Sequence, residues 1–445
     1  MQSKQISVVG AGLVGCLASI YLAKRGYKVS VFERRPDVRQ ESVDMGRSIN
    51  LALSNRGLRA LEEIGAAEKV RQIAIPMHGR MIHAIDKTMT FQPYGKDGQF
   101  INSISRRNLN ILLLEIAEQY GVKFNFGHRA LHADFDSTSL KFESANGAMH
   151  KSFDGIVGAD GAFSALRHDM QFTDRYDFCQ DYIDHGYKEF QIPAGKGGQF
   201  LLETNALHIW PRESFMLIAL PNPNGTFTCT LFFPFEGELS FKSLSSNENI
   251  LDFFATYFPD ALPLMPDLLE DFKINPTSSL VTIKCYPWVR KKTLLIGDAA
   301  HAIVPFYGQG MNAGFEDCRI LNAMLDYCDD NWEKAISNFQ QERKKDTDAI
   351  AELALDNFIE MRDLVADKEF LLRKKIESKL HSLYPERWIP LYSMVTFHTD
   401  VRYSEAQRIG ARQKAIMDEV MKMQDIESTW EHLNFEQLAR SLQAV

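Results

Sequence analysis

The chain begins with short apolar runs separated by a segment rich in small residues. Residues 6–9 and 29–32 are rich in β-branched and aromatic side chains, which predicts two strands with a helix between them. A later helix is predicted to be capped near Asn108 and to end at Gly121. Strands that alternate with helices are typical of a parallel α/β sheet. We therefore expect the chain to open with a strand–helix–strand unit.

The pattern changes between about residues 175 and 285, where short β-rich runs follow one another without helical periodicity. Two such runs flank "PNG" at residues 223–225, which is a hairpin signal, and an earlier pair of runs turns near Asp86 and Lys87. These runs predict an antiparallel sheet. From about residue 331 the spacing of apolar residues is helical to the end of the chain, with a break at "YPERWIP".

Three glycines occupy the predicted turn between the first strand and the helix. Gly10, Gly12 and Gly15 have the G-x-G-x-x-G spacing, and Glu33 ends the second strand 18 residues after the last of them. Gly10 permits a tight turn, Gly12 lets the backbone approach a pyrophosphate, and Gly15 allows helix and strand to pack closely. The free N–H groups of the helix N-terminus would face the phosphates. The pattern predicts a dinucleotide-binding site, with a purely structural glycine turn as the alternative.

Two later segments place an acidic residue and glycines at the end of a strand. Asp160 and Gly161 lie in "GADGAFSALR", which ends at Arg167, and Asp298 lies in "LIGDAAH". The sequence "GQGMN" then opens a helix at about Met311. A carboxylate at a strand end can accept hydrogen bonds from sugar hydroxyls, and glycines let backbone N–H groups approach a ligand. These segments look like the floor of a cofactor site rather than plain core.

Composition and charge exclude several classes of protein. The net charge is −8 with acidic and basic residues interspersed, so nucleic-acid binding is not expected. Six cysteines without a C-x-x-C pair argue against a disulfide framework or a metal site, and they fit a reducing cytoplasm. The sequence has no run of about 18 apolar residues, so we predict no membrane span. The N-terminus enters a strand without a signal-peptide pattern, and we expect a cytoplasmic protein.

The three glycine sites, in this order over residues 4–325, resemble those of the FAD-dependent aromatic hydroxylases, which are single-component flavoprotein monooxygenases. Longer segments resemble one branch of that family, which hydroxylates L-kynurenine, over nearly the whole chain. These segments are "GRSINLALSNRG", "GRMIH", "FQPYG", "SISRRNLN", "IALPNPNGTFTCTLFFPFEG", "GDAAHAIVPFYGQGMNAGFEDC", "LDNFIEMRD" and "PLYSMVTF".

The resemblance implies an α/β fold of three parts. They are a Rossmann-type FAD-binding domain of the p-hydroxybenzoate-hydroxylase-like fold, an antiparallel β-sheet substrate domain, and a C-terminal helical region that covers the substrate site. The expected bounds are residues 1–75, 97–174 and 286–330 for the FAD-binding domain, 76–96 and 175–285 for the substrate domain, and 331–445 for the helical region.

The resemblance also implies a reaction. NADPH would visit transiently and reduce the bound FAD, and the reduced flavin would react with O₂ to form a C4a-hydroperoxide. Transfer of the distal oxygen to the ring carbon ortho to the aniline nitrogen would convert L-kynurenine to 3-hydroxykynurenine, a step of tryptophan catabolism. The cofactor would supply the chemistry, and the protein would supply placement and electrostatics. The alternatives are hydroxylation of another aromatic carboxylic acid, a flavin-dependent dehydrogenase or oxidase, and a non-catalytic FAD-binding module.

Residues that match the family's cofactor contacts are spread over the first domain. Arg106 would reach the phosphate or ribityl part of FAD, and Arg107 beside it is the alternative. The amides of Met311 and Asn312 would lie near the flavin N1–C2 carbonyl, where a helix N-terminus favours the anionic reduced flavin. The full set is Gly10, Gly12, Val14, Gly15, Glu33, Arg35, Ala52, Arg106, Ala130, Asp298, Gly310, Met311 and Asn312.

The resemblance assigns the substrate to a smaller group of residues. Arg80 lies in an apolar strand, where an unpaired cation is unfavourable, and its fork of N–H donors suits a carboxylate. Tyr94 and Tyr392 would donate hydroxyls, with ordinary packing as the alternative for both. Asn357 would bind the amino acid end of the substrate. Glu360, on nearly the same helical face, would hold the α-ammonium directly or through water, or else would belong to a solvated face.

Four further residues remain open at this point. Phe232 and Phe233 alternate along a strand, so only one of them can face the pocket. Gln309 could bond the flavin edge or the substrate carbonyl, and no other catalytic side chain is expected beyond the flavin. His301 is interpreted as structural rather than as a general base, because an electron-rich aniline ring does not call for a strong base.

The C-terminal part differs from that of eukaryotic relatives. Those relatives carry a C-terminal hydrophobic segment that places them on the mitochondrial outer membrane, and this chain ends at Val445 without one. We therefore expect a soluble, bacterial-type form. The C-terminal helices carry Asn357 and Tyr392, so their motion could gate the site. The sequence carries no signal for an oligomeric state.

Overall fold

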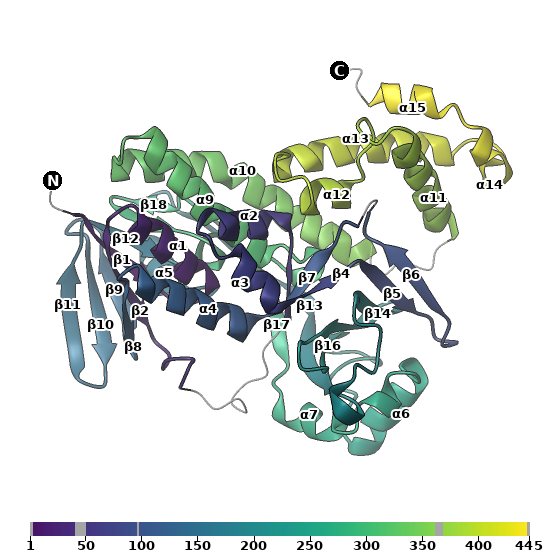
Figure 1. The fold of residues 1–445 in the computed structure, drawn as a ribbon, viewed down its shortest axis with the longest axis horizontal. Helices are drawn as coiled ribbons and strands as arrows, with labels where there is room; N and C mark the ends of the chain where they lie inside the picture. The colour runs from purple at the N-terminus through teal and green to yellow at the C-terminus, as the bar shows by residue number, and fades with distance from the viewer. Residues whose placement is uncertain (1–2, 41–49, 96–97, 361–367, 443–445) are drawn as a thin grey trace.

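The N-terminal part of the chain is built on a six-stranded sheet. The computed structural model describes residues 3–40, 50–95, 98–360 and 368–442 (Figure 1). Five strands of this sheet run parallel, and β18 pairs antiparallel at one edge. In spatial order the strands are β18 (Val289–Arg290), β19 (Thr293–Leu295), β12 (Gly155–Gly158), β1 (Gln5–Val9), β2 (Lys28–Glu33) and β8 (Lys123–Phe126).

Helices and two small sheets surround this sheet. Buried apolar residues of β1, α1, α4 and α9 belong to one continuous core, which explains why the small-residue helix after β1 is buried on most sides. The helices are α1 (Leu13–Lys24), α2 (Asn55–Glu63), α3 (Ala67–Gln72), α4 (Arg106–Gln119), α5 (Ala165–Met170), α8 (Asp298–His301) and α9 (Gly310–Tyr327), with the 3₁₀ turn η3 (Pro305–Tyr307) before α9. The small sheets are β9 (Arg129–Asp134) with β10 (Ser139–Ser144) and β11 (Gly147–Ser152), and β3 (Asn50–Leu53) with β7 (Ile101–Ser105) and β4 (Ala74–Met77).

The helix α4 begins earlier than the sequence predicted. Its N-cap is Ser105, whose hydroxyl oxygen accepts a hydrogen bond from the Asn108 backbone N–H at 3.3 Å. The prediction of a cap near Asn108 is wrong because Asn108 supplies the capped amide and not the capping side chain. Consequently Arg106 and Arg107 belong to the first turn of the helix.

A second sheet of seven strands forms the other half of the molecule. The predicted antiparallel pairing holds for every neighbouring pair except β14 and β5, which run parallel. The hairpin of β5 and β6 comes from a distant stretch of chain, so no tight turn forces β5 to oppose β14. In spatial order the strands are β17 (Ser278–Tyr286), β13 (Asp177–Ile192), β16 (Phe227–Pro234), β15 (Phe215–Pro221), β14 (Ala206–Arg212), β5 (Gly79–His83) and β6 (Met89–Pro93).

The two faces of this sheet have different neighbours. One face packs on α6 (Asn247–Tyr257) and α7 (Leu268–Ile274), which lie together at the lower end of the view in Figure 1. Phe233 belongs to that face and contacts Phe253 with ring centroids 4.8 Å apart. Phe232 belongs to the opposite face and lies 5.0 Å from the ring of Phe306. The period of two along a strand separates the neighbouring phenylalanines in this way.

The helices of residues 368–441 gather at the end of the molecule opposite β9–β11 (Figure 1). Apolar residues of α10, α12 and α13 share a core with the free face of the seven-stranded sheet. Of the helices in the described segments, none has both the length and the apolar composition that a bilayer crossing needs. The C-terminal helices are α10 (Trp332–Ile359), α11 (Lys368–Leu383), α12 (Leu391–Thr396), α13 (Tyr403–Met421), α14 (Ile426–Thr429) and α15 (Phe435–Ser441).

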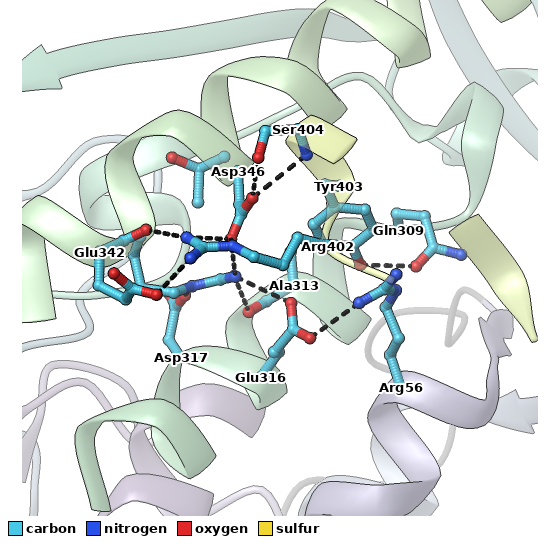
Figure 2. A network of polar contacts seen from close by, with 12 residues as sticks. Arg56, Gln309, Ala313, Glu316, Asp317, Glu342, Asp346, Arg402, Tyr403 and Ser404 are labelled. Carbon is cyan, nitrogen blue, oxygen red and sulfur yellow. Dashed lines mark hydrogen bonds and ion pairs between the residues drawn. The ribbon is translucent and has the colours of Figure 1, made fainter. Parts of the chain in front are cut away.

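Buried ion pairs join α2, α9 and α10 (Figure 2). Arg343 of α10 pairs with Glu316 at 2.9 Å and with Asp317 at 3.0 Å, both in α9. Glu316 also pairs with Arg56 of α2 at 2.9 Å, and Asp317 accepts the Gly297 backbone N–H at 2.9 Å. All four charged side chains are nearly or fully buried. Because an unpaired charge at such depth is strongly unfavourable, the pairs fix the relative positions of the three helices.

A buried chain of hydrogen bonds ties β5 to β14. The His83 ring lies 2.7 Å from Asp260 Oδ2 through Nδ1 and 2.9 Å from His208 Nδ1 through Nε2. His208 Nε2 lies 2.8 Å from the Glu203 carbonyl oxygen, which can only accept, so this nitrogen is the donor. Burial is the main cause that lowers the pKa of His208 to about 4. The His208 ring is therefore neutral in the folded protein at pH 7.

We expect His208 to make the protein less stable in mild acid. In the unfolded chain a histidine titrates at its ordinary pKa of 6.5, whereas folded His208 takes up a proton only near pH 4. Between these values the unfolded state binds more protons, so the free energy of unfolding falls as the pH falls and recovers above pH 6.5. At pH 5 the contribution of this one group is a loss of about 2 kcal/mol.

Urea unfolding of the wild type and of His208→Gln at pH 7 and pH 5 measures this contribution. The glutamine keeps an N–H donor for the Glu203 carbonyl, and the carboxylates titrate alike in both proteins. The difference in unfolding free energy between the two should change by about 2 kcal/mol in favour of the variant as the pH falls. An equal difference at both pH values would contradict the assignment.

Candidate active site

One large cavity lies between the six-stranded and the seven-stranded sheets. Its volume is about 1070 Å³. One end is lined by the glycine turn after β1 and by the end of β2, and the other end by the face of the seven-stranded sheet that α6 and α7 do not cover. Because the lining is continuous, one binding space extends from the predicted dinucleotide site to the predicted substrate site.

The turn between β1 and α1 leaves room for a pyrophosphate. Gly10 has φ +102°, and a Cβ on it would lie 2.4 Å from the Ala159 carbonyl oxygen. A Cβ on Gly15 would lie 2.0 Å from the Gly10 carbonyl oxygen. By contrast, a Cβ on Gly12, the N-cap of α1, would meet no atom within 4 Å, and Gly12 lines the cavity. Gly10 and Gly15 are needed for packing, whereas Gly12 keeps open the space in front of the helix N-terminus.

Glu33 ends β2 with its carboxylate held beside this turn. Oε2 accepts the Ala11 backbone N–H at 2.8 Å, and Oε1 accepts the backbone N–H and the Nε–H of Arg35 at 3.0 and 2.9 Å. Burial alone would raise the pKa of Glu33, but Arg35 and the backbone N–H groups outweigh it, so the pKa is lowered. Both residues line the cavity, where an ionised carboxylate can accept from the hydroxyls of a ribose.

The two arginines at the start of α4 have different surroundings. Arg106 lines the cavity, whereas Arg107 Nη2 donates to the Val38 carbonyl oxygen at 2.9 Å. The sequence allowed either arginine at the cofactor, and the structure brings Arg106 to the cavity. Three further residues predicted at the cofactor also line it: Val14, Ala52 and Ala130.

Two acidic residues at strand ends line the cavity as well. Asp298 begins α8 and is exposed. Asp160 follows β12, and its Oδ2 accepts the Ala165 backbone N–H at 2.7 Å. Its Oδ1 is buried and has no hydrogen-bond partner in the described part of the chain, and burial raises the pKa of this carboxyl group. An unpartnered polar atom in a cavity wall is a natural contact for a polar group of a ligand.

The N-terminus of α9 opens onto the cavity through its backbone. Gly308 is left-handed with φ +66°, and Gly310 and Met311 line the cavity with it. The side chain of Asn312 points elsewhere: its Nδ2 donates to the carbonyl oxygens of Ala52 at 2.9 Å and Gly308 at 2.7 Å. A cofactor contact through Asn312 would therefore have to come from its backbone N–H, while its side chain holds β3 against the helix.

Gln309 and His301 are engaged away from the cavity. Gln309 Oε1 accepts from the Tyr403 hydroxyl at 2.9 Å, and His301 Nε2 lies 2.6 Å from Asp317 Oδ2. Burial alone would raise the pKa of Asp317, but His301 and Arg343 outweigh it, so the pKa is lowered. The structure does not place the Gln309 side chain at a flavin edge or a substrate carbonyl, because its oxygen is used by a C-terminal helix.

At the other end of the cavity, Arg80 of β5 has an incompletely paired guanidinium group. Its Nε is buried and has no hydrogen-bond partner among the described residues. The guanidinium carbon lies 4.8 Å from the Tyr392 ring centroid and 5.6 Å from that of Tyr94. Burial alone would lower the pKa of Arg80, but Tyr392, Tyr94 and the more distant Glu360 outweigh it, so the pKa is raised. A charged and incompletely paired fork of donors in a cavity wall is a receptor for an anion.

Three tyrosine rings stack beside Arg80. The centroids of Tyr94 and Tyr392 are 5.6 Å apart at an interplanar angle of 13°, and those of Tyr392 and Tyr307 are 5.5 Å apart at 20°. Tyr392 and Tyr307 line the cavity. The Tyr94 hydroxyl is buried without a partner in the described residues, and burial raises its pKa, so it remains a neutral donor. Sequence reasoning missed Tyr307, whose signal is its place in "PFYGQG" next to the glycines of the α9 N-terminus.

The predicted substrate residues of α10 are bound to other parts of the protein. Asn357 Nδ2 donates to the Phe306 carbonyl oxygen at 2.7 Å, and Glu360 Oε1 pairs with Lys374 of α11 at 3.4 Å. Neither residue lines the cavity. Asn357 thus holds a segment that does line it, whereas Glu360 faces a neighbouring helix.

An apolar wall connects the two ends of the cavity. Phe232 belongs to this wall, and Phe233 packs in the core on the other face of the sheet, which resolves the pair that the sequence left open. Other apolar residues of the sheet that line the cavity include Leu207, Met216, Ile218 and Leu220.

The first end of the cavity has the donors and acceptors that FAD needs. The space in front of Gly12 suits the pyrophosphate, and the ionised Glu33 suits a ribose. Asp298 and the unpartnered oxygen of Asp160 add acceptors for the remaining polar groups. The residues present therefore fit the cofactor that the sequence resemblance implies.

Comparison with known proteins gives the same cofactor. Residues 3–184 and 277–347 match a family model described as FAD binding domain. The chain is 49% identical to the kynurenine 3-monooxygenase of Christiangramia forsetii over 444 residues, with 99% of each chain covered. It is 50% identical to that of Flavobacterium johnsoniae with 96% of each chain covered, and 46% identical to that of Dictyostelium discoideum with 95% of this chain and 94% of the relative covered.

Solved structures share the fold at lower identity. The tetrameric form of 2-methyl-3-hydroxypyridine-5-carboxylic acid oxygenase has a TM-score of 0.68 at 23% identity and covers 84% of this chain and 96% of its own. Pseudomonas aeruginosa PqsL in complex with 2-aminobenzoylacetate has a TM-score of 0.66 at 16% identity and covers 81% and 97%. With a cavity that fits FAD and relatives that share close to half of its residues from end to end, the chain belongs to the kynurenine 3-monooxygenase family of FAD-dependent monooxygenases.

Proposed function

We propose that this enzyme hydroxylates L-kynurenine to 3-hydroxykynurenine, with NADPH and O₂ as co-substrates. The balanced reaction converts L-kynurenine, NADPH, O₂ and a proton to 3-hydroxykynurenine, NADP⁺ and water. The observation that carries the proposal is the buried guanidinium of Arg80, whose Nε has no hydrogen-bond partner among the described residues, at the apolar end of a cavity that continues to the FAD site. Relatives that match over nearly the whole chain are kynurenine 3-monooxygenases, which supports the choice of substrate.

Arg80 would bind the substrate carboxylate. Its two terminal nitrogens and its Nε form a planar fork that matches a carboxylate, and such charge-assisted bonds are strong in a site that excludes water. Tyr392 and Tyr94 flank the guanidinium, so both hydroxyls would be near the same carboxylate. Binding there would give the buried Nε and the buried Tyr94 hydroxyl the partners that they lack among the described residues.

The apolar wall would hold the aminophenyl ring. Phe232, Met216 and Ile218 offer a surface that favours an aromatic ring over water. A ring held between this wall and the cofactor end would have a fixed edge toward the reacting atoms, which is the positioning contribution to the rate. Asn357 would act in this site by holding the Phe306 carbonyl, since its Nδ2 donates to that oxygen.

The cofactor end would supply the redox chemistry. FAD, when bound, accepts two electrons from NADPH and activates O₂ for the transfer of one oxygen atom to the ring. The glycine turn, Glu33 and Arg106 would hold its phosphates and ribose. The backbone of Gly310 and Met311, at the N-terminus of an 18-residue helix, would stabilise negative charge on the reduced ring system.

The experiment that tests the proposal is NADPH oxidation by the purified FAD-bound enzyme with and without L-kynurenine, with product mass read in parallel. Stimulated oxidation and a product one oxygen atom heavier are expected. No stimulation in a folded, FAD-bound protein would contradict the kynurenine assignment. Stimulation by another aromatic carboxylic acid instead would favour hydroxylation of that acid, whose carboxylate Arg80 would bind equally well.

Replacing Arg80 should abolish most substrate affinity and leave FAD in place. In Arg80→Ala the KM for L-kynurenine should rise about 100-fold, which corresponds to the loss of charge-assisted hydrogen bonds worth about 3 kcal/mol. Arg80→Lys keeps the charge but not the planar fork and should give an intermediate KM. Steady-state kinetics and the flavin absorption spectrum measure both effects. Normal saturation by L-kynurenine in Arg80→Ala would show that the carboxylate binds elsewhere.

Substitutions at Gly12 and Gly10 should have different effects on FAD affinity and on the stability of the apoprotein. Gly12→Ala adds a methyl group to open space, so the apoprotein should unfold within about 0.5 kcal/mol of wild type, while FAD affinity should fall at least tenfold because the pyrophosphate loses that space. Gly10→Ala is the matched control. Its Cβ would meet the Ala159 carbonyl at a positive φ, so it should destabilise the apoprotein by about 2 kcal/mol. Urea unfolding measures the stability of each apoprotein, and titration with FAD measures its affinity. An equal loss of stability in both variants would contradict the different roles of Gly12 and Gly10.

A further inference from the structure

The segment of residues 305–310, here called the cavity turn, connects the two ends of the site. Pro305, Phe306, Tyr307, Gly308 and Gly310 line the cavity. The turn leads directly into α9, whose first backbone N–H groups face the cofactor end. Its glycine at 308 adopts a left-handed conformation, which glycine reaches at little steric cost.

Three C-terminal helices hold the cavity turn. Asn357 of α10 donates to the Phe306 carbonyl oxygen at 2.7 Å. Tyr392 of α12 stacks on Tyr307 with centroids 5.5 Å apart. The third contact comes from Tyr403 of α13. Phe306, Tyr307 and Gln309 are thus each attached to a different helix.

The third contact is a hydrogen bond between Tyr403 and Gln309. The Tyr403 hydroxyl donates to Gln309 Oε1 at 2.9 Å, and the two residues are 0% and 2% exposed (Figure 2). The Tyr403 ring lies under the guanidinium of Arg56, 4.1 Å from its central carbon. Arg56 in turn donates to the Val395 carbonyl oxygen at 2.7 Å and pairs with Glu316. Tyr403 therefore has a fixed position, and its hydroxyl meets the residue that begins α9.

We propose that Tyr403 is a positioning residue of the hydroxylation reaction, which acts through Gln309 on the backbone of the cavity turn. This inference rests on the function proposed above. When the Tyr403 hydroxyl bonds Gln309, the cavity turn has a single conformation that directs its backbone N–H groups to the flavin and Tyr307 to the substrate. Without this bond, FAD and L-kynurenine still bind, but the substrate ring is no longer aligned with the flavin.

The expected consequence is loss of coupling between NADPH use and hydroxylation. In the coupled reaction one oxygen atom of O₂ enters the ring and the other becomes water. In the uncoupled reaction NADPH, O₂ and a proton give NADP⁺ and H₂O₂, with both electrons of NADPH passing to O₂ and no bond formed to the substrate. Misalignment favours the second outcome because oxygen transfer depends on distance and angle, whereas reduction of O₂ does not require the substrate to be aligned.

The variant Tyr403→Phe removes only the hydroxyl. Hydrogen–deuterium exchange of the amides of residues 306–312 should become about fivefold faster in the apoprotein, a factor set by the loss of one hydrogen bond. In the FAD-bound enzyme the KM for L-kynurenine should stay within about twofold of wild type, while hydroxylated product per NADPH should fall about fivefold and peroxide should rise to match. A merely structural role would lower thermal stability and leave the product ratio unchanged.

Two further variants make the test specific. Tyr21→Phe removes another buried hydroxyl, which donates to the Ala60 carbonyl oxygen at 2.9 Å and lies away from the cavity turn, so it should leave the product ratio unchanged. Gln309→Met removes the acceptor of the bond and should reproduce the defect of Tyr403→Phe. The double variant should be no worse than either single variant, since both break the same contact.

The two proposals fail in different ways. If L-kynurenine does not stimulate NADPH oxidation by the wild type, the substrate assignment is wrong. Hydrogen–deuterium exchange of the amides of residues 306–312 in the apoprotein still decides the role of Tyr403. Unchanged exchange in Tyr403→Phe overturns the positioning role whatever the substrate. Faster exchange with an unchanged product ratio overturns it as well, because the turn would then move without affecting the reaction.

Discussion

Arg343 is a cation in the interior of the protein, and the placement of the site depends on its partners. Moving a guanidinium or a carboxylate out of water costs several kcal/mol, which only close and well-oriented partners offset. The pairs of Arg343 with Glu316 and Asp317 therefore allow α9 and α10 only one relative arrangement. Asp317 passes this constraint to the cofactor end, because it also accepts the Gly297 N–H beside Asp298.

The same cluster extends to the C-terminal helices. Asp346 of α10 lies 3.5 Å from Arg343 and accepts from Arg402 Nε at 3.0 Å and from the Ser404 hydroxyl at 2.7 Å (Figure 2). These contacts flank Tyr403 on both sides along the chain. The start of α13 is thus fixed to α10 by charge, and the position of Tyr403 follows from it. In this way, ion pairs that lie outside the cavity determine the position of the cavity turn, which lines it.

Local sequence signals were sufficient for most of the fold and for the glycine turn at the cofactor end. The spacing of Gly10, Gly12 and Gly15 needs no tertiary information, because each glycine answers a steric demand within one strand–helix unit. The parallel pairing of β14 with β5 could not be predicted, since it joins two distant stretches of chain. The cap of α4 was misplaced because serine and asparagine are both good capping residues, and only the backbone geometry distinguishes them.

The substrate end was predictable by residue type but not by contact. Arg80 and Tyr392 line the cavity as expected. Glu360 instead forms an ion pair with Lys374 of α11, and the local sequence does not predict that this helix lies beside it. Asn312 was predicted to contact the cofactor through its backbone amide, and the Gln309 side chain was predicted at the flavin edge or the substrate carbonyl. The structure uses both side chains to fasten the N-terminus of α9 to other segments, which is a tertiary role that sequence spacing does not reveal.

The alternation of Phe232 and Phe233 has a consequence for how such an enzyme can change over generations. Residues of one parity along the strands build the core over α6 and α7, and residues of the other parity form the wall of the cavity. A substitution on the cavity side alters which ring fits without removing contacts from that core. Neighbouring positions along one strand are therefore under different selective pressures. The position that faces the cavity can vary with the ligand, while the next position keeps the core.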